Sequence, residues 1–447
     1  MDFKFTADQQ KAFDLLMQGE NVFITGDAGT GKSELLKRYL EKVADDKKIV
    51  VTAPTGIAAI NVNGVTIHRA FNYLPHPMLP VDNFKFKAND VLRNADIIVI
   101  DEISMLRRDI FDVLALQILT VESTTHRNKQ IIVFGDFFQL PPVINPNERQ
   151  TIETFIPSYG DGYCFQSPLW KSLDFKPVVM TQVIRQKEPL FVENLKKIKY
   201  NYKDGIDFFN KMCYGKSIDE DAINICATNK DADNINTYKL NQLKTPVHTF
   251  TSETNILVKN ADINKGDKAN EDIVNLKVGC RVMSLLNDKE GKYQNGSLGT
   301  VTEIKDKQVT VKFDNGHSAS FTPYTWDIMR YSANCNKSDD TETDEFGNKL
   351  VKIVSGSVEK TVAARFTQIP LKVAYAITVH KSQGQTYDKC NINLSTIFSY
   401  GQMYVALSRC KSLEGLTLQR PLPSNVKLTN PYVIDFYARE VYSGIQV

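Results

Sequence analysis

A glycine-rich segment near the beginning of the chain constrains the fold more strongly than any other feature. Residues 26–33 read GDAGTGKS, which fits the pattern GxxxxGK[ST]. The segment follows a short apolar run at residues 21–25, expected to be a strand, and precedes an expected helix at residues 32–43. A strand, a glycine-rich turn and a helix in this order bind phosphate, because backbone N–H groups and the positive end of the helix face the anion. The sequence therefore predicts an α/β fold with a phosphate loop.

The side chains of this loop predict how a nucleotide is held. Lys32 is placed to reach the β- and γ-phosphates, and the hydroxyl of Ser33 is placed to hold Mg²⁺. The glycines let the backbone amides turn inward around the phosphate oxygens. ATP and Mg²⁺ are therefore the expected cofactors. The residues of the loop expected to contact the nucleotide are Gly26, Ala28, Gly29, Thr30, Gly31, Lys32 and Ser33.

A pair of acidic residues supplies the expected second anchor for the metal. The apolar run Ile97–Ile100 ends in Asp101 and Glu102. A carboxylate at the C-terminal edge of a buried parallel strand, beside a phosphate loop, is the usual partner of Mg²⁺. We expect Asp101 to hold the metal through water and Glu102 to orient or deprotonate the attacking water. Without the glycine loop, the same pair would indicate only the solvated end of a strand.

Short apolar runs alternate with helical segments, which is typical of a parallel sheet covered on both faces. The expected strands lie at 48–52, 96–100, 130–134, 177–181 and 221–226, and the expected helices at 110–119, 188–200 and 229–243. From about residue 245, short strands joined by Asn-Gly turns at 295–296 and 315–316 favour a small antiparallel barrel. We expect an N-terminal lobe at 1–176 and a C-terminal lobe at 177–447, interrupted by the barrel at about 250–365.

Two segments interrupt this pattern. The first, residues 69–95, contains three prolines together with aromatic and basic residues. Prolines at this density exclude a long helix or an interior strand, so we expect a small excursion from the sheet. Its aromatic residues look exposed, although a core position is equally open for Phe71 and Tyr73. The second segment, residues 332–349, is polar and acidic and is expected to form a mobile loop.

The composition excludes several classes of protein. No uncharged apolar run approaches the roughly 18 residues that a membrane span needs, and the N-terminus lacks the apolar core of a signal peptide. The seven cysteines show no CxxC pair and no histidine partner at zinc spacing, which favours reduced thiols. We therefore expect a cytoplasmic protein, from a bacterium or a phage. With a net charge of only +2, any nucleic-acid binding must depend on positive charge concentrated in one groove.

Hydrolysis of the γ-phosphate requires more positive charge than Mg²⁺ and one lysine supply. An arginine from another domain would complete the charge compensation and would couple hydrolysis to domain closure. Arg185 and Arg409 stand out as candidates. Considered singly, each is more readily explained as a surface or salt-bridged arginine.

Taken in order, several segments resemble the motifs of the PIF-type DNA helicases, in the RecD-like branch of superfamily 1B. The most diagnostic is GDFFQLPPV at residues 135–143, which is similar to motif III. The other matching segments lie at residues 5–9, 26–33, 53–59, 64–68, 101–105, 181–186, 378–386 and 402–409. The resemblance covers nearly the whole chain and implies two RecA-like lobes, with a duplex-splitting wedge at 69–95 and an SH3-like inserted domain around 295–299.

The resemblance also implies roles for particular residues around the nucleotide. Gln9 would read the adenine, Gln139 would sense the γ-phosphate, and Gly384 would lie beside the nucleotide. Arg185 and Arg409 would be the arginines that the C-terminal lobe supplies. ATP would therefore be bound between the two lobes.

Contacts with a DNA strand are expected in both lobes. The candidates are Thr55, Gly56 and His68 in the first lobe, and Thr378, His380 and Lys381 in the second. Small residues and hydroxyls can approach a phosphate backbone closely, and flat rings stack on bases without reading their sequence. An ordinary packed or exposed histidine remains the alternative for His68.

The activity implied by the resemblance is ATP hydrolysis that drives movement along single-stranded DNA from 5′ to 3′, with unwinding of duplex or forked DNA. The direction comes from the resemblance alone. The protein is expected to act as a monomer, with a dimer on DNA as the alternative. Two other functions stay open: an ATP-regulated single-strand clamp that does not separate strands, and a phosphate-loop ATPase that acts on proteins or metabolites.

Overall fold

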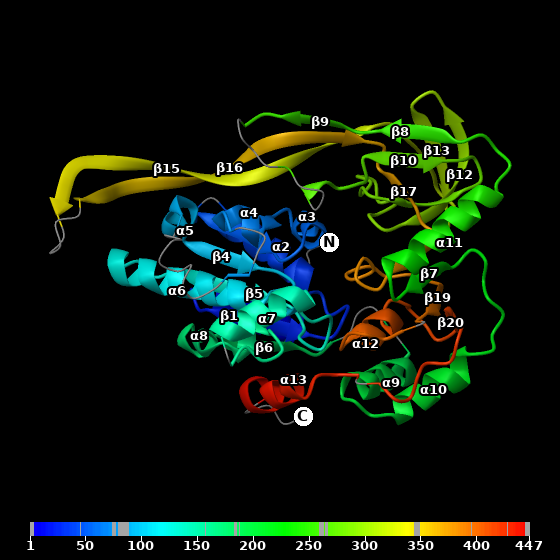
Figure 1. The fold of residues 1–447 in the computed structure, drawn as a ribbon, viewed down its shortest axis with the longest axis horizontal. Helices are drawn as coiled ribbons and strands as arrows, with labels where there is room; N and C mark the ends of the chain where they lie inside the picture. Colours follow the sequence, from blue (N-terminus) through cyan, green and yellow to red (C-terminus); the bar gives the residue numbers. More distant parts are fainter. Residues whose placement is uncertain are drawn as a thin grey trace.

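The structure is a computed structural model, and its elements form two α/β lobes and an antiparallel insertion (Figure 1). It describes residues 4–44, 46–73, 77–78, 89–156, 158–182, 186, 188–258, 263, 267–343, 349–394, 396–426 and 428–442. None of the helices formed by these residues combines the length and the apolar character that a membrane crossing needs.

The first lobe is built on a six-stranded parallel sheet in the order β3-β2-β4-β5-β1-β6. Its strands are β1 (Val22–Gly26), β2 (Ile49–Ala53), β3 (Val65–Thr66), β4 (Ile97–Ile100), β5 (Gln130–Phe134) and β6 (Lys176–Met180). Its helices are α1 (Ala7–Met17), α2 (Lys32–Val43), α3 (Gly56–Asn61), α4 (Ile67–Phe71), α5 (Asp90–Asn94), α6 (Arg108–Thr125), α7 (Pro146–Phe155) and α8 (Pro168–Ser172), with short 3₁₀ turns η2 (Ile103–Met105) and η3 (Cys164–Gln166).

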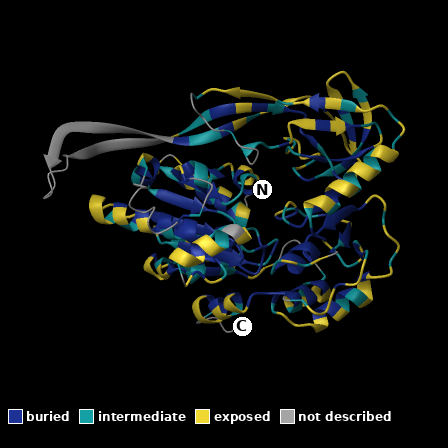
Figure 2. Cartoon of the chain, in the orientation of Figure 1, coloured by how far each residue is buried: buried dark blue, intermediate teal, exposed yellow. Residues whose placement is uncertain are grey.

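Successive residues along the central strands enter different cores. Ile97 and Val99 of β4 pack in the cluster that contains α1 and α2, whereas Ile98 and Ile100 pack in the cluster that contains α6. Alternate side chains of a strand point to opposite faces, so a sheet covered on both faces needs apolar residues at every position. This explains the continuous apolar runs, and Figure 2 shows the interior of this lobe as buried.

The expected boundary between the lobes at residues 176–177 is wrong. β6 pairs in parallel with β1 along its full length, so the strand belongs to the first sheet. The last helices, α13 (Pro431–Phe436) and the π-helical turn η5 (Tyr437–Val441), also return to the first lobe, where Val433 and Phe436 pack in its core. The sequence of a short apolar strand is the same whichever sheet it joins. Only its pairing with a neighbouring strand shows to which lobe it belongs.

The second lobe has a four-stranded parallel sheet in the order β18-β7-β19-β20. Its strands are β7 (Ile223–Cys226), β18 (Ala376–Thr378), β19 (Cys390–Asn393) and β20 (Leu416–Leu418). The helices are α9 (Pro189–Lys199), α10 (Asp204–Cys213), α11 (Asn229–Gln242) and α12 (Gln402–Leu407). A single core joins α9, α10, α12 and this sheet, and the predicted repetition of an α/β layer is confirmed.

The insertion between β7 and β18 is antiparallel, as predicted. A five-stranded sheet has the order β14-β13-β12-β11-β17, and β8 pairs with β10 beside it. The strands are β8 (His248–Thr251), β10 (Ile273–Leu276), β11 (Arg281–Ser284), β12 (Leu298–Lys305), β13 (Gln308–Phe313), β14 (Ser318–Phe321) and β17 (Leu371–Val373). Gly296 and Gly316 have positive φ angles of 93° and 88°, as tight Asn-Gly turns require.

The prediction of a mobile loop at residues 332–349 is wrong for residues 332–343. They belong to β15 (Tyr324–Thr343), which pairs with β16 (Lys349–Gln368), and β9 (Glu253–Ile256) pairs with β16 in turn. Pairing between the strands satisfies the backbone hydrogen bonds of this segment. Its sequence is polar and shows no alternation of apolar residues that would have predicted a strand. The hairpin crosses the first lobe at α4 and α5 (Figure 1), and residues 344–348 lie outside the described part.

The segment 69–95 begins in α4 and ends in α5, and the short helices agree with the proline content. Phe71 and Tyr73 are buried in the first core, at 3% and 5% exposure, so their exposed appearance in the sequence was misleading. Residues 74–76 and 79–88, which would form most of the predicted wedge, lie outside the described residues.

Candidate nucleotide and DNA site

The phosphate loop connects β1 to α2 through two positions that only glycine fits. Gly31 has φ 85° and precedes the helix without a capping side chain. A Cβ atom on Gly26 would lie 2.4 Å from the carbonyl oxygen of Met180. The backbone can turn at these positions because neither residue carries a side chain. The strand, the glycine-containing turn and the helix thus follow one another at the positions expected from the sequence.

Lys32 lies over its own loop. Its Nζ donates hydrogen bonds to the carbonyl oxygens of Gly26, at 2.8 Å, and Asp27, at 3.0 Å. Thr30 Oγ1 donates to the same Asp27 oxygen at 3.0 Å. Removal from water lowers the pKa of Lys32, while Asp136 and Glu102 act against that shift. The ammonium group is thus held by neutral carbonyls, which a phosphate can replace as a stronger, charged partner.

Asp101 and Glu102 follow β4 on the same side of the sheet as the phosphate loop. Together with Ser33 they line one groove, with a volume of about 1510 Å³. Glu102 has a positive φ of 52°, a strained backbone conformation for a residue with a side chain and one that is common at functional sites. Burial raises the pKa of Asp101 to about 7, with the neighbouring Glu102 adding to the shift. Burial also raises the pKa of Glu102.

A side chain of the second lobe contacts Glu102 directly. Gln383 Nε2 donates to Glu102 Oε2 at 2.8 Å and lies 3.5 Å from Gln139 Oε1. Three segments that are distant in sequence therefore meet at the side-chain amide of Gln383. Gln383 was not among the residues expected from the sequence to act at the site, although its position inside the motif-like run 378–386 was an available signal.

Arg409 lies entirely inside the second lobe, with 1% of its surface exposed. Its guanidinium donates to the carbonyl oxygens of Val405, at 2.9 Å, Ser382, at 3.3 Å, and Gln385, at 3.2 Å. Burial lowers the pKa of Arg409, and the Glu102 carboxylate opposes that effect. The arginine is therefore fixed by the backbone of the segment that carries Gln383, close enough to Glu102 to act on its charge.

Arg185 lies outside the described residues, but its neighbourhood is described. Gln186 Nε2 donates to the carbonyl oxygens of Ser408, at 2.9 Å, and Cys410, at 3.1 Å. These two residues flank Arg409 in the sequence. The chain segments that carry the two predicted arginines are therefore bound to each other.

Gln9 has the environment expected of a side chain that binds a base. It is 1% exposed, and its Oε1 accepts from the backbone N–H of Thr6 at 3.0 Å. Thr6 Oγ1 in turn accepts from the N–H of Gln9, which forms a capping box at the start of α1. Among the described residues, the Nε2 of Gln9 has no hydrogen-bond partner. An unpaired buried donor is costly, so a ligand acceptor such as a ring nitrogen fits it.

The predicted DNA-contacting residues of the first lobe lie at the starts of α3 and α4. Thr55 caps α3, its hydroxyl accepting from the N–H of Ala58, and Gly56 is the first residue of that helix. His68 lies in α4, where burial lowers its pKa and the Arg107 guanidinium adds to the effect. His68 is therefore favoured as a neutral ring, which suits stacking better than ion pairing.

The candidates of the second lobe follow β18. Thr378 Oγ1 accepts from the N–H of Lys381, whose side chain is exposed. The ring of His380 stacks on Phe398, with centroids 6.3 Å apart and planes 9° from parallel. A Cβ atom on Gly384 would lie 4.0 Å from Asn61 Nδ2 of α3, so the segment after β18 lies against α3 across the boundary of the lobes.

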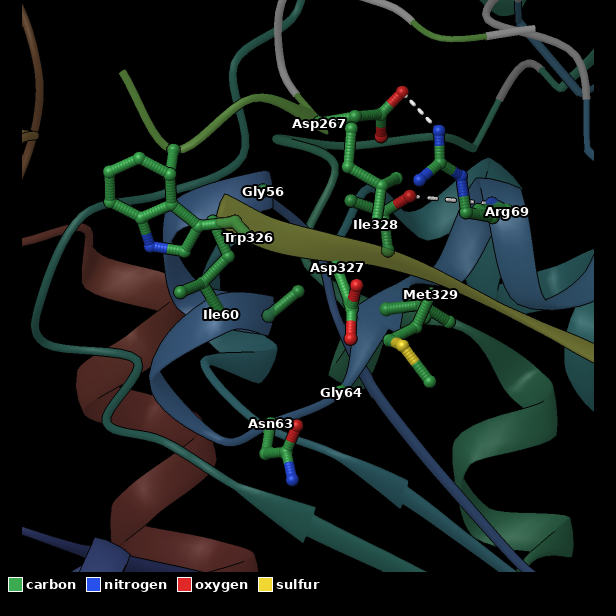
Figure 3. A pocket seen from close by; sticks show the side chains of 14 residues that line it. Gly56, Ile60, Asn63, Gly64, Arg69, Asp267, Trp326, Asp327, Ile328 and Met329 are labelled. Atoms are coloured by element: carbon green, nitrogen blue, oxygen red, sulfur yellow. Dashed lines mark hydrogen bonds and ion pairs between the residues drawn. The ribbon is translucent and has the colours of Figure 1, made fainter. Parts of the chain in front are cut away.

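The base of the long hairpin rests on the same part of the first lobe. Gly56, Ile60 and Gly64 form one wall of a cavity of about 160 Å³, and Trp326 and Met329 lie on its other side (Figure 3). Arg69 and Asp267, which form an ion pair, also line it. The insertion is thus packed beside α3, next to the expected path of a strand.

Comparison with known proteins agrees with this geometry. The PIF1-like helicase family matches residues 4–222. The ATP-dependent DNA helicase Pif1 of Campylobacter jejuni is 29% identical over 96% of this chain and 96% of its own. The structure of Pif1 from Bacteroides sp. with ADP-AlF4 is 33% identical, covers 99% of this chain and 98% of its own, and has a TM-score of 0.82. Bacteroides Pif1 bound to ssDNA is 34% identical, with coverages of 98% and 97% and a TM-score of 0.67.

The two Bacteroides structures cover almost the same residues of this chain, so the lower score reflects a different arrangement of the same fold. The present arrangement is more similar to the ADP-AlF4 complex, at 0.82, and to unliganded Pif1 from Bacteroides sp., at 0.81, than to the ssDNA complex, at 0.67. Ser33, at the end of the phosphate loop, and Glu102 line one groove together with Gly384 of the second lobe. Because a relative 33% identical matches almost the entire length, the chain belongs to the PIF1-like helicase family.

Proposed function

We propose that this protein is an ATP-dependent DNA helicase that moves from 5′ to 3′ on single-stranded DNA and separates the strands of duplex or forked DNA. The observation that carries the proposal is the contact of Glu102, in the first lobe, with Gln383 in the second. It joins the groove lined by Ser33 and Asp101 to the segment that carries Thr378 and His380. Relatives with the same fold are named ATP-dependent DNA helicases, which supports the activity.

The residues at the groove fit a hydrated Mg²⁺ ion. Mg²⁺ prefers oxygen ligands and is usually held by one or two carboxylates together with substrate phosphates. Ser33 and Asp101 supply a hydroxyl and a carboxylate to the same groove. No cluster of three or more acidic, histidine or cysteine side chains in the described part forms a complete cage, which agrees with a site that the nucleotide completes. Bound there, Mg²⁺ would neutralise charge on the β- and γ-phosphates.

Different residues of the chain would then have separate roles in hydrolysis. Lys32 would exchange its carbonyl partners for the β- and γ-phosphates. Glu102 would accept a proton from the attacking water, and its pKa, which burial raises, makes it a stronger base than an exposed glutamate. Gln383 and Gln139 would sense whether the γ-phosphate is present, because the amide of Gln383 donates to Glu102 and lies beside the amide oxygen of Gln139. Loss of the phosphate would loosen the contact between the lobes and change the spacing of their contacts with DNA.

The pKa of Asp101 predicts a pH dependence of metal binding. Only the ionised carboxylate binds Mg²⁺, so binding should release protons below about pH 7 and should strengthen as the pH rises from about 6 to 8. Because the folded protein binds this proton more tightly than the unfolded chain, the stability of the metal-free protein should fall as the pH rises from about 4 to 7. Calorimetry of MgATP binding in buffers of different ionisation enthalpy measures the protons released. An Asp101→Asn variant should release none from this site.

Phe398 predicts a loss of DNA affinity. Its ring is 62% exposed and lies parallel to His380, so it offers a surface on which a base can stack. A Phe398→Ala variant should bind single-stranded DNA more weakly by about 1–3 kcal/mol, with ATP affinity unchanged. Fluorescence anisotropy with a labelled oligonucleotide measures the DNA affinity of the variant and of the parent protein. Tyr432→Ala, which removes a ring that is 59% exposed on α13, is the matched control, and equal losses would contradict a specific stacking role.

The proposed activity is tested by strand separation on matched substrates. Duplexes with a 5′ tail, a 3′ tail or no tail are incubated with protein, ATP and Mg²⁺, and ATP hydrolysis is measured in parallel with and without single strands. Only the 5′-tailed duplex should be unwound, and a Lys32→Ala variant serves as the inactive reference. Stimulation of hydrolysis without unwinding would favour a clamp, and no stimulation at all would favour an ATPase with another substrate.

A further inference from the structure

A lysine of the second lobe reaches the phosphate loop. Lys199 is the last residue of α9 and is 2% exposed. Its Nζ lies 2.6 Å from Oδ1 of Asp27, the second residue of the loop, and 3.4 Å from Oδ2 of Asp136, which follows β5. Both carboxylates belong to the first lobe. One cation of the second lobe is therefore bound to two anions of the first.

The charge state of this group is well defined. Burial alone would favour a neutral lysine, but the Asp136 and Asp27 carboxylates outweigh it and hold the pKa of Lys199 well above its usual range. Burial likewise opposes ionisation of Asp27, and Lys199 nevertheless keeps the pKa of that carboxyl below its usual value. Removing one partner of such a buried group would leave an uncompensated charge.

Other side chains hold the ammonium group in position. It lies 4.5 Å from the centre of the Phe138 ring and 5.8 Å from that of Tyr404, as in cation–π contacts. Phe138 directly precedes Gln139, and Tyr404 lies in α12, the helix before Arg409. The carbonyl oxygen of Lys199 accepts from Thr429 Oγ1 at 2.6 Å. The lysine therefore contacts the loop, the segment of Gln139 and the helix that leads to Arg409.

Asp27 also controls the residue that binds phosphate. Its backbone oxygen accepts from both Thr30 Oγ1 and Lys32 Nζ, so the position of Asp27 sets that of the loop lysine. An aspartate next to bound ATP is unfavourable unless its charge is compensated, because the triphosphate is itself strongly negative. A cation from the other lobe provides this compensation only while the lobes are together.

We propose that Lys199 is a positioning residue that makes the phosphate loop competent for ATP when the second lobe is docked, by neutralising Asp27 and drawing its carboxylate away from the γ-phosphate. The proposal rests on the ATP-binding part of the proposed function and does not depend on DNA unwinding. It predicts that the docked second lobe favours triphosphate over diphosphate, because the extra charge of ATP is the charge that Asp27 would repel. The coupling is reciprocal, so bound ATP stabilises docking of α9 on the loop.

The test is a mutant cycle on nucleotide affinity, measured on the full chain without DNA. Lys199→Met should weaken ATP binding at least tenfold and ADP binding less, so that the ratio of the two affinities falls. Lys199→Arg should keep the ratio close to that of the parent, because charge and reach are preserved. Asp27→Asn in the Lys199→Met background should restore ATP binding, since the carboxylate that needs compensation is gone. Lys197→Met is the matched control, because this lysine of the same helix pairs only with Glu193 and Asp204 among the ion pairs of the described residues.

The outcomes separate positioning from a purely structural role. A structural lysine would lower the melting temperature and weaken ATP and ADP equally, and Asp27→Asn would then add a further loss instead of a recovery. That result, or an unchanged ratio in Lys199→Met, overturns the proposal. If Lys199→Met does not fold, Asp27→Asn alone decides the question, because it should tighten ATP binding or leave it unchanged while a structural ion pair would weaken it. A protein that shows this cycle but does not unwind DNA would refute the helicase function alone.

Discussion

Replacing Arg409 by lysine is expected to lower the turnover of ATP by about 10³-fold or more, while ATP still binds. The guanidinium is fixed by three backbone carbonyls of its own lobe and lies within electrostatic reach of Glu102. Lysine keeps the charge but cannot make the same planar set of contacts. The positive charge would no longer be held in the position that the transition state requires, whereas ground-state binding depends mainly on the phosphate loop. Pre-steady-state hydrolysis and titration with a fluorescent nucleotide separate the two effects.

The control for Arg409 must address its burial. A smaller residue at a site 1% exposed would leave a cavity, so thermal unfolding of each variant is measured first. Arg439→Lys, which changes an arginine that is 75% exposed and paired with Asp435, should leave turnover unaltered. If Arg409→Lys folds normally and hydrolyses ATP at the parent rate, Arg409 has no part in the reaction.

Glu102→Gln is expected to reduce turnover by about 10²–10⁴-fold with little change in ATP affinity. The amide keeps the shape of the side chain and can still hydrogen-bond to Gln383, but it cannot accept a proton from water. The variant should therefore accumulate bound ATP, which rapid quenching detects as unhydrolysed nucleotide.

Asp101→Asn is the matched comparison for Glu102→Gln, since the two acidic residues are adjacent and both face the groove. Asp101 is assigned to the metal, so the Asp101→Asn variant should require a higher Mg²⁺ concentration for half-maximal activity. Glu102 is assigned to the water, so added Mg²⁺ should not restore the turnover of the Glu102→Gln variant. Rescue of Glu102→Gln by Mg²⁺ would reverse the two assignments.

The parts of the site that were predictable are local in the chain. The helix expected at residues 32–43 and the strand expected at 130–134 have those bounds in the structure. Their boundaries depend on glycine turns and short apolar runs, which act over a few residues. The position of Asp101 at the end of β4 was predictable for the same reason, because it follows directly from the bounds of the buried strand.

The parts that were missed depend on pairing. The bond from Gln383 to Glu102 joins residues 281 apart, and the bond from Lys199 to Asp27 joins residues 172 apart. No spacing in the sequence distinguishes Lys199 from the other lysines of α9. The assignment of β6 to the first sheet and the strand conformation of residues 332–343 were likewise decided by partners far along the chain.

The sequence by itself determined the phosphate loop, the acidic residues that face it and the presence of two α/β layers, because each follows from a few adjacent residues whose backbone has little choice. The tertiary structure alone decided which cations and amides reach those acidic residues. A charge is buried only where an opposite charge or a hydrogen-bonding group contacts it. These contacts form when the two lobes and the returning C-terminal segment pack together.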